Sequence, residues 1–267
     1  MAGKVFVITS GKGGVGKSTN TANIGTGLAM NGRKVCVVDA DIGLRNLDMV
    51  LGLENRIVYD LVNVIERKCK ISQALIRDKR HKNLFLLPAA QTRSKEAVSS
   101  DQMLELTEKL RKVFDYVLID CPAGIEVGFR NAVIGADIAL LITTPEVSAV
   151  RDVDRVIGLL EASGKRNPKL IINRLNPELV RKGDMLDTET ILQILGVELI
   201  GVVPEDDNMV AYTNRGEPAI LFANKSIAGQ AFKNIVRRIE GEEVAFLPLD
   251  GNRGFFRGLK RLVRLGS

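Results

Sequence analysis

The segment Gly11-Lys12-Gly13-Gly14-Val15-Gly16-Lys17-Ser18 matches the phosphate-binding pattern GxxxxGK[ST]. It follows the short apolar run Val5–Thr9 and leads at once into Thr19–Met30, a helical pattern closed by Asn31-Gly32. A phosphate-binding loop requires this order of a buried strand, a glycine-rich loop and a helix. The segment therefore predicts an α/β fold built around a nucleotide site.

Each residue type in this loop has a chemical task. Glycines let successive backbone N–H groups turn toward phosphate oxygens, and the N-terminus of the following helix adds positive potential. Lys17 is expected at the β- and γ-phosphates and the Ser18 hydroxyl in the Mg²⁺ shell. The predicted cofactors are therefore ATP and Mg²⁺, with the nucleotide held by Gly11, Lys12, Gly13, Gly14, Val15, Gly16, Lys17, Ser18 and Thr19.

Apolar runs alternate with helical patterns along the rest of the chain. The runs are nearly continuous, as expected for strands that helices cover on both faces. They predict a doubly wound, mostly parallel sheet whose ligands lie beyond the carboxyl ends of its strands. The predicted strands are Val5–Thr9, Val35–Asp39, Leu84–Leu87, Tyr116–Asp120, Ile138–Thr143, Lys169–Asn173 and Leu199–Val203. The predicted helices are Thr19–Met30, Asp101–Val113, Val150–Glu161, Asp187–Leu195 and Ile227–Ile239.

Aspartates at strand ends supply the carboxylates that a phosphate site needs. Asp120 closes the apolar strand Tyr116–Asp120, which is the Walker B pattern, and we expect it to hold Mg²⁺ through the metal's water shell. Asp39 closes another strand, and Asp41 follows on the same face of an extended segment. Asp41 is expected to orient the attacking water. Asp39 is expected to order the magnesium ligands from the second layer, without binding the metal directly. A strand-ending aspartate can also be a turn or cap residue, and only the neighbouring loop favours the catalytic interpretation.

Composition and charge limit the other possibilities. The chain has 267 residues, of which 45% are hydrophobic and 26% charged, with three widely spaced cysteines and one histidine. This argues against a disulfide framework or a His/Cys metal site. Neither a secretory signal nor a membrane-spanning run is present, so a cytoplasmic location is expected. The net charge of +6 comes mostly from five basic residues after Gly251, which leaves a nearly neutral body and makes nucleic acid an unlikely partner.

The last residues have the pattern of a helix that lies on a membrane. A turn-rich stretch before them predicts an ATPase domain at 1–247, a linker at 248–254 and a membrane-targeting amphipathic helix at 255–267. Such a helix binds anionic lipid weakly, and two copies on a dimer bind more strongly. An alternative is that it packs on its own body. Its apolar face carries Phe255, Phe256, Leu259, Leu262 and Val263, and its basic face Arg257, Lys260, Arg261 and Arg264.

The loop has a lysine, Lys12, in addition to Lys17, and this makes the loop resemble that of a known family. With Lys12 directly after the first glycine, the loop resembles that of the deviant Walker A ATPases, the ParA/MinD family. The resemblance implies that Lys12 crosses a dimer interface to the partner's nucleotide and that ATP drives formation of the homodimer. A lysine that simply faces solvent is the alternative.

Further segments resemble the MinD branch, whose members select the cell-division site. They include Asp39–Asp48, Arg77–Arg80, Pro145–Val147, Val150–Arg155 and Gly201–Asp206. The resemblance implies a MinC-like inhibitor and a MinE-like activator as partners, at the inner face of the cell membrane or a plastid envelope. It puts Asn46 at the dimer interface and makes Arg45, Arg151, Asp152 and Asp154 partner contacts. Alternatively, Arg151 and Asp152, together with Arg155, are the exposed face of an ordinary helix with local ion pairs. The resemblance implies base recognition by Asn173, Arg174, Pro204, Glu205 and Asp206.

Two other functions compete with this interpretation. A ParA-type DNA-partition ATPase shares both loop lysines, but it needs a basic patch on the dimer body for contacts with DNA phosphates. A metabolic kinase or ligase of P-loop type would need an acceptor pocket, and no motif for one is present. Neither explains the paired phenylalanines of the basic tail.

Overall fold

The computed structural model describes residues 2–249, which form an eight-stranded sheet with strand order β3-β4-β2-β5-β1-β6-β7-β8. β3 pairs with β4 in antiparallel fashion, and every other neighbouring pair is parallel. The strands are β1 (Lys4–Thr9), β2 (Val35–Asp39), β3 (Ile76–Arg77), β4 (Leu84–Leu87), β5 (Tyr116–Asp120), β6 (Ile138–Thr143), β7 (Lys169–Leu175) and β8 (Glu198–Pro204).

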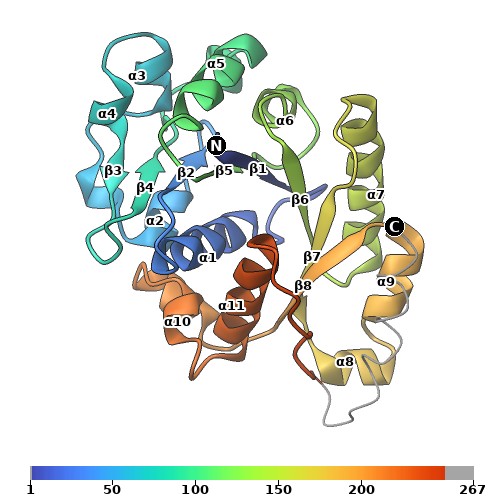
Figure 1. Ribbon diagram of the computed structural model, residues 1–267. Coiled ribbons are helices and arrows are strands. Elements are labelled where there is room, and N and C mark those ends of the chain that lie inside the picture. The colour runs from blue at the N-terminus through green and yellow to red at the C-terminus, as the bar shows by residue number, and fades with distance from the viewer. Residues whose placement is uncertain (1, 250–267) are drawn as a thin grey trace.

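Helices connect these strands and cover both faces of the sheet (Figure 1). Among the described residues they are α1 (Lys17–Met30), α2 (Leu47–Leu51), α3 (Leu61–Ile65), α4 (Ile71–Ala74), α5 (Ser100–Leu110), α6 (Val127–Val133), α7 (Val147–Ala162), α8 (Pro177–Lys182), α9 (Thr188–Leu195), α10 (Met209–Asn214) and α11 (Ile227–Ile239). Short 3-10 turns lie at Glu54–Arg56, Lys95–Ala97 and Ala219–Phe222. None of the helices in residues 2–249 has both the length and the apolar character needed to cross a membrane.

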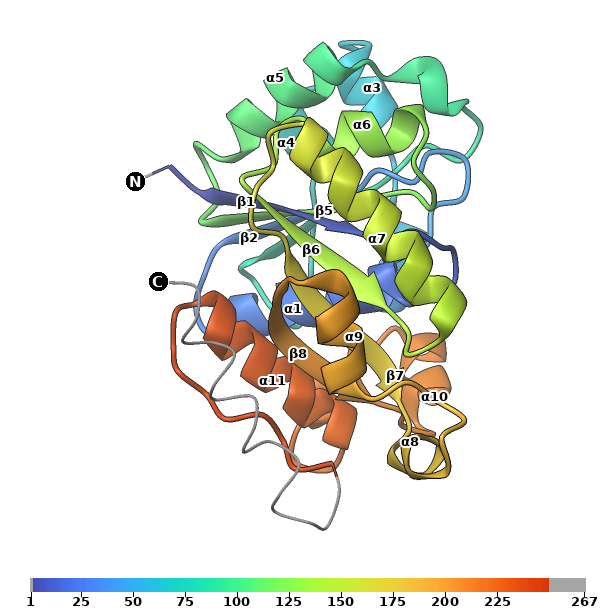
Figure 2. The same ribbon diagram turned by 90° about the vertical axis from the view of Figure 1, so that its right-hand side faces the viewer.

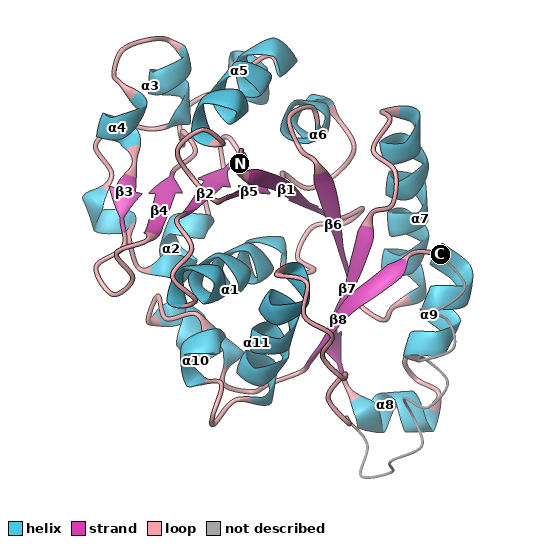
Figure 3. Cartoon of the chain, viewed as in Figure 1, coloured by secondary structure: helices cyan, strands magenta, loops and turns pink. Residues whose placement is uncertain are grey.

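The sheet separates two hydrophobic cores, and β1 contributes to both. Val5 and Val7 belong to the core under α5, α6, α7 and α9, whereas Phe6 and Ile8 belong to the core under α1 and α11. This alternation follows from the two-residue period of a strand. Figures 2 and 3 show the sheet between these two helical layers. The predicted doubly wound α/β fold is confirmed.

The predicted elements agree closely with the observed ones. Four strands and the last helix have the predicted bounds, and the other predicted strands differ by one or two residues at an end. The helix predicted at Asp101–Val113 ends earlier, at Leu110, where the N–H groups of Val113 and Phe114 both turn back to the Leu110 oxygen. β3 and the short helices had no long periodic pattern from which they could be predicted.

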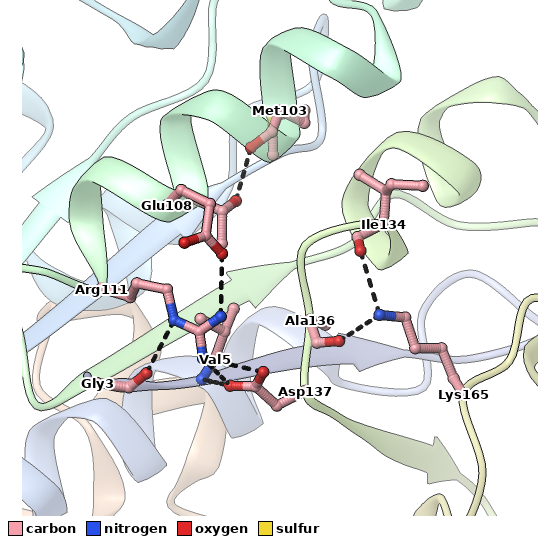
Figure 4. Close-up of polar contacts among 10 residues, drawn as sticks. Gly3, Val5, Met103, Glu108, Arg111, Ile134, Ala136, Asp137 and Lys165 are labelled. Atoms are coloured by element: carbon pink, nitrogen blue, oxygen red, sulfur yellow. Dashed lines mark hydrogen bonds and ion pairs between the residues drawn. The ribbon is translucent and has the colours of Figure 1, made fainter. Parts of the chain in front are cut away.

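The amino ends of the central strands are held by a polar cluster at the edge of the sheet away from the phosphate loop (Figure 4). Arg111 donates to the Gly3 oxygen at 3.3 Å and forms ion pairs with Glu108 at 3.0 Å and Asp137 at 2.9 Å. Asp137 in turn accepts the Val5 N–H at 2.8 Å. These contacts fix α5 and the turn before β6 to the start of β1, which anchors the strand that carries the phosphate loop.

Candidate nucleotide-binding site

The phosphate loop joins the carboxyl end of β1 to α1 in the middle of the sheet. Gly14 and Gly16 have φ angles of +76° and +99°, a region in which side chains other than glycine are strained. Gly16 is also the N-cap of α1, so the N–H groups of the helix's first turn have no partner within the helix. These groups and the positive end of the helix form the cradle expected for phosphate oxygens.

Lys17 is buried at the base of this loop. Only 8% of its surface is exposed, and its Nζ donates to Ser10 Oγ at 2.9 Å. Ser10 Oγ in turn donates to the Lys12 backbone oxygen at 2.7 Å, so Ser10 links the lysine to the loop backbone. Ser10 was not predicted as a site residue, although its place between strand and loop could have indicated it.

Lys12 extends away from the same loop toward solvent. Its side chain is 47% exposed, and its Nζ lies 3.4 Å from Oε2 of Glu146, which is itself 57% exposed. An exposed pair of this kind contributes about 0–1 kcal/mol. The two lysines of the loop therefore have different environments, one buried under the phosphate site and one at the protein surface.

Asp39 and Asp120 lie side by side at the carboxyl ends of β2 and β5, where they are register partners. Both are buried. Asp120 accepts hydrogen bonds from the Ser18 side chain and from Thr21 Oγ1, the latter at 3.3 Å. Burial, and then repulsion from Asp39, raise the pKa of Asp120 to about 8. Thr21 was also not predicted, although it lies one helical turn beyond Ser18 and so shares its face.

Asp39 holds the loop that follows β2. Its Oδ1 accepts the N–H of Asp41 at 3.0 Å, and its Oδ2 accepts the N–H groups of Asn46 and Leu47, both at 3.1 Å. Burial raises the pKa of Asp39 to about 6 against the effect of these bonds. Asp39 thus orders the half-buried Asp41 and the start of α2 relative to the phosphate loop.

The residues assigned to base recognition lie at the carboxyl ends of β7 and β8 or directly after β8, at the same edge. Asn173 is buried, and its Nδ2 donates to the Val15 backbone oxygen at 2.7 Å, which braces the phosphate loop. Arg174 is exposed with a φ of +59°, and Pro204 is the last residue of β8. These positions bring Asn173, but not Arg174, into contact with the loop.

Glu205 and Asp206 have structural contacts of their own. Glu205 accepts a hydrogen bond from the Asn176 amide at 2.9 Å. The Asp206 carboxylate accepts bonds from Ser226 Oγ at 2.6 Å and from the Asn208 N–H at 2.9 Å. Although burial opposes it, this hydrogen bonding lowers the pKa of Asp206. Because Ser226 is the N-cap of α11, Asp206 fixes the start of that helix.

The predicted partner contacts lie around the same edge. Arg45 has a φ of +41° and forms an ion pair at 2.9 Å with the buried Asp48, while Asn46 is the N-cap of α2. On α7, Arg151 and Asp154 are exposed. Asp152 packs so closely on the phosphate loop that a Cβ on Gly11 would lie 2.3 Å from its backbone carbon. The contacts predicted at 255–267, and the linker from residue 250 onward, lie outside the described residues.

The donor set fits a nucleotide with Mg²⁺. In the described part of the chain, no three carboxylate, histidine or cysteine side chains converge as a ready metal cage. Mg²⁺ is commonly bound through one or two carboxylates together with substrate phosphates, and Ser18 and Asp120 at the cradle supply protein oxygens of that kind. The buried pair of carboxylates, with pKa values raised in the absence of a cation, is the arrangement that a divalent ion would neutralise.

The chain also resembles proteins of known kind. A family model described as an AAA domain matches residues 3–172. The septum site-determining protein MinD of Synechocystis sp. is 55% identical over 244 residues, which cover 91% of this chain and 92% of that protein. A chain of the MinC:MinD cell division protein complex of Aquifex aeolicus matches with a TM-score of 0.86 and 51% identity, covering 92% of this chain and 99% of that chain. MinD of Pyrococcus horikoshii, complexed with Mg-ADP, matches with a TM-score of 0.81 and 30% identity, covering 89% and 96%.

A phosphate loop at the centre of a doubly wound sheet, with carboxylates at the ends of the neighbouring strands, defines a P-loop ATPase. Its two loop lysines are those of the deviant Walker A class. With relatives that match over nearly its whole length, the chain belongs to the MinD family of septum site-determining ATPases.

Proposed function

We propose that this chain selects the division site as a Mg²⁺-dependent ATPase that dimerises with ATP, binds anionic membrane through residues 255–267 and recruits a MinC-like inhibitor there. A MinE-like partner stimulates ATP hydrolysis, which releases the protein from the membrane. The relatives support the proposal, because one MinD structure contains Mg-ADP and another MinD was solved as a complex with MinC.

The site residues divide the work of hydrolysis. Lys17 and the loop N–H groups bind the β- and γ-phosphates, and Ser18 and Asp120 hold the metal. Mg²⁺ held by these residues would supply positive charge that offsets the charge developing on the phosphates. Asp41 orients the water that attacks, and Asp39 keeps Asp41 and α2 in place through the backbone bonds described above. Asn173 holds the phosphate loop in its binding shape, and the loops after β7 and β8 surround the base.

The outward position of Lys12 carries the proposal of an ATP-bound dimer. Lys17 already occupies the base of the loop, and Lys12 is directed to the surface with a weak, exposed partner in Glu146. A cation in this position can reach a nucleotide on a facing subunit, as arginine fingers do in other phosphoryl-transfer enzymes. Supplying this charge only in the dimer makes hydrolysis depend on dimerisation.

Apolar side chains at the nucleotide edge support a second copy as the facing subunit. Leu44, Ile125, Val127 and Val147 have 45–65% of their surface exposed, and they follow the carboxyl ends of three strands: Leu44 follows β2, Ile125 and Val127 follow β5, and Val147 follows β6. Because parallel strands end at the same edge, these residues lie at the edge of the sheet that carries the phosphate loop. Aliphatic groups exposed around a charged site are typical of a surface that another protein covers.

A complementation experiment tests the transfer of Lys12 between subunits. Lys12→Ala and Asp41→Ala chains are each expected to be nearly inactive, by a factor of about 10³ for loss of the lysine. Mixing them forms heterodimers in which one site has its own Asp41 and receives Lys12 from the other chain. Stimulated ATP hydrolysis should then return to that site. If the mixture stays as inactive as its components, Lys12 does not act in trans.

Sedimentation with anionic liposomes tests the membrane step. ATP should drive the full chain onto the vesicles, whereas ADP should not, and a chain that ends at Asp250 should stay in the supernatant with either nucleotide. The control is to measure ATP-dependent dimerisation of the truncated chain in solution. Dimerisation there shows that the truncated chain is still folded and binds ATP. Binding that ignores the nucleotide or survives the truncation would remove the membrane switch and favour a DNA-partition ATPase.

A further inference from the structure

The residues after α11 form a strap, defined here as 243–249, that has no regular secondary structure but is held against the body. In Figures 1 and 2 the chain turns back at the end of α11 and runs beside that helix. A segment without a backbone ladder needs side chains to hold it. Arg238 of α11 donates side-chain hydrogen bonds to this strap, and apolar side chains of the strap pack against the body.

Arg238 directs its whole guanidinium group at the strap and at β8. Its Nε and Nη2 donate to the backbone oxygens of Val244 at 3.0 Å and Ala245 at 2.9 Å. Its Nη1 donates to the Ile200 oxygen of β8 at 2.9 Å. The Phe246 ring lies 4.1 Å from the guanidinium carbon, within the range of a cation–π contact. Burial lowers the pKa of Arg238 to about 10, so the group remains charged at neutral pH.

The geometry of β8 explains why an arginine is needed at this place. The register of β7 and β8 pairs Leu170 with Leu199 and Ile171 with Gly201, so it passes over Ile200. A residue left out in this way forms a bulge, whose backbone groups are not matched in the ladder. Arg238 donates to the Ile200 oxygen and to two strap oxygens at once. The single ammonium group of a lysine does not provide donors in this planar, forked arrangement.

The apolar side chains of the strap lie on both sides of the sheet. Phe246 and Leu249 pack against the core under α5, α6, α7 and α9, and Leu247 packs against the core under α1 and α11. The strap therefore crosses the outer edge of β8, which is the last strand of the sheet. Covering an edge strand protects its unpaired groups, so the strap also closes one side of the domain.

We propose that Arg238 is a positioning residue that clamps the strap to β8 and so fixes the point from which the C-terminal tail leaves the ATPase body. The consequence rests on the proposed membrane function. If the strap is released, the segment between the last held residue and the predicted membrane helix lengthens from five residues, 250–254, to twelve, 243–254. Effective concentration falls roughly as the −3/2 power of tether length, so ATP-dependent lipid binding should weaken about fourfold.

The experiment compares Arg238→Ala with Arg237→Ala in the full chain. Arg237 is the matched control, because it is the adjacent arginine of α11 but pairs with Glu242 at 2.8 Å and not with the strap. Hydrogen exchange at the amides of 243–249 reports the clamp, and sedimentation with anionic liposomes and ATP reports its effect. Arg238→Ala should raise strap exchange and require about fourfold more lipid, whereas Arg237→Ala should change neither. ADP binding confirms that each variant is folded.

A seven-residue Gly-Ser insertion after Leu249 separates tether length from the clamp itself. With Arg238 intact, it should leave strap exchange unchanged and reproduce the loss of lipid binding. Should Arg238→Ala fail to fold, Phe246→Ala removes the ring contact and should raise strap exchange in its place. Unchanged strap exchange in the folded Arg238 variant, or released straps with unaltered lipid binding, overturns the proposal. A wild-type chain that never sediments with ATP contradicts the membrane function instead, and the exchange measurement still decides whether Arg238 holds the strap.

Discussion

The side-chain amide of Asn173, near the end of β7, donates a 2.7 Å hydrogen bond to the backbone oxygen of Val15 in the phosphate loop. The amide is buried, and a Cβ on Gly16 would lie 2.4 Å from its nitrogen, so loop and amide are in close contact. Asn173 therefore couples the strand that leads to the base-binding region with the loop that binds phosphate. This contact holds the loop in its binding shape before a nucleotide arrives.

Replacing Asn173 with alanine should weaken nucleotide binding. The change leaves the Val15 oxygen buried without its donor, a loss of about 1–3 kcal/mol that falls on the phosphate loop. We expect the Kd for ADP to rise by about 5- to 150-fold, measured by titration with a fluorescent nucleotide. Lys169, at the amino end of the same strand, is the control because it pairs with Glu198 away from the loop, and Lys169→Ala should change the Kd little. An unaltered Kd in the Asn173 variant would mean that the bond does not shape the loop.

The difference between Asn173 and Arg174 illustrates what the sequence could predict. The motif, the strand-ending aspartates and the alternation of strands and helices depend on local patterns, and several strands were predicted with their observed bounds. That Asn173 reaches across to Val15 depends on the meeting of segments 158 residues apart. No local pattern carries such a contact, and the resemblance alone suggested a role in base recognition.

Buried polar pairs were missed for the same reason. Asp48 lies in the first turn of α2 and is buried beneath Arg45. Arg238 is the second of two adjacent arginines in the last turn of α11 and holds the strap and β8. Charged residues are rarely buried without a partner, so sequence reasoning assigns them to the surface until the fold supplies that partner.

The nucleotide-free protein should lose stability as pH rises through the range in which Asp39 and Asp120 ionise. The ordinary pKa of an aspartate is 3.8, but burial raises the folded-state pKa of Asp39 to about 6 and that of Asp120 to about 8. Between these limits the folded state binds more protons than the unfolded state, so raising the pH favours unfolding. The stabilisation is complete below the unfolded pKa and is lost as pH rises through the folded values.

Urea unfolding at several pH values measures this effect. In Asp120→Asn the fall in unfolding free energy between about pH 6 and pH 8 should be much reduced, because the asparagine stays neutral. Asp154→Asn, which changes an exposed acid on α7, should keep the wild-type slope. Binding of Mg²⁺ with nucleotide requires the ionised form, so it should release protons when added near pH 7. An identical slope in the Asp120 variant would show that this pair does not control the pH dependence.

Two glycine-to-alanine changes should have opposite effects on stability. A Cβ on Gly11 would lie 2.3 Å from the backbone carbon of Asp152, so Gly11→Ala forces the phosphate loop and α7 apart. We expect a loss of about 1–3 kcal/mol, with weaker nucleotide binding. Gly158 lies on α7, as Asp152 does. A Cβ added to Gly158 has nothing within 4 Å, and the φ of Gly158 is not positive. Gly158→Ala should therefore raise the unfolding free energy by about 0.4–1 kcal/mol. Thermal and urea unfolding measure both, and equal effects would contradict the close packing of loop and helix.

The Arg45–Asp48 pair separates a structural role from a partner contact. The Asp48 side chain is 2% exposed and Arg45, at 2.9 Å, is 17% exposed, so removing the arginine leaves a buried acid without its cation. Arg45→Asn is the suitable change, because asparagine tolerates the φ of +41° at this position. It should lower the unfolding free energy by about 1–3 kcal/mol. Adding Asp48→Asn removes the unpaired charge and should restore much of the lost unfolding free energy.

If Arg45 also contacts a MinC-like protein, the double variant should be stable but bind that protein more weakly in a pull-down with ATP. A double variant that binds like wild type would restrict Arg45 to its role within the fold.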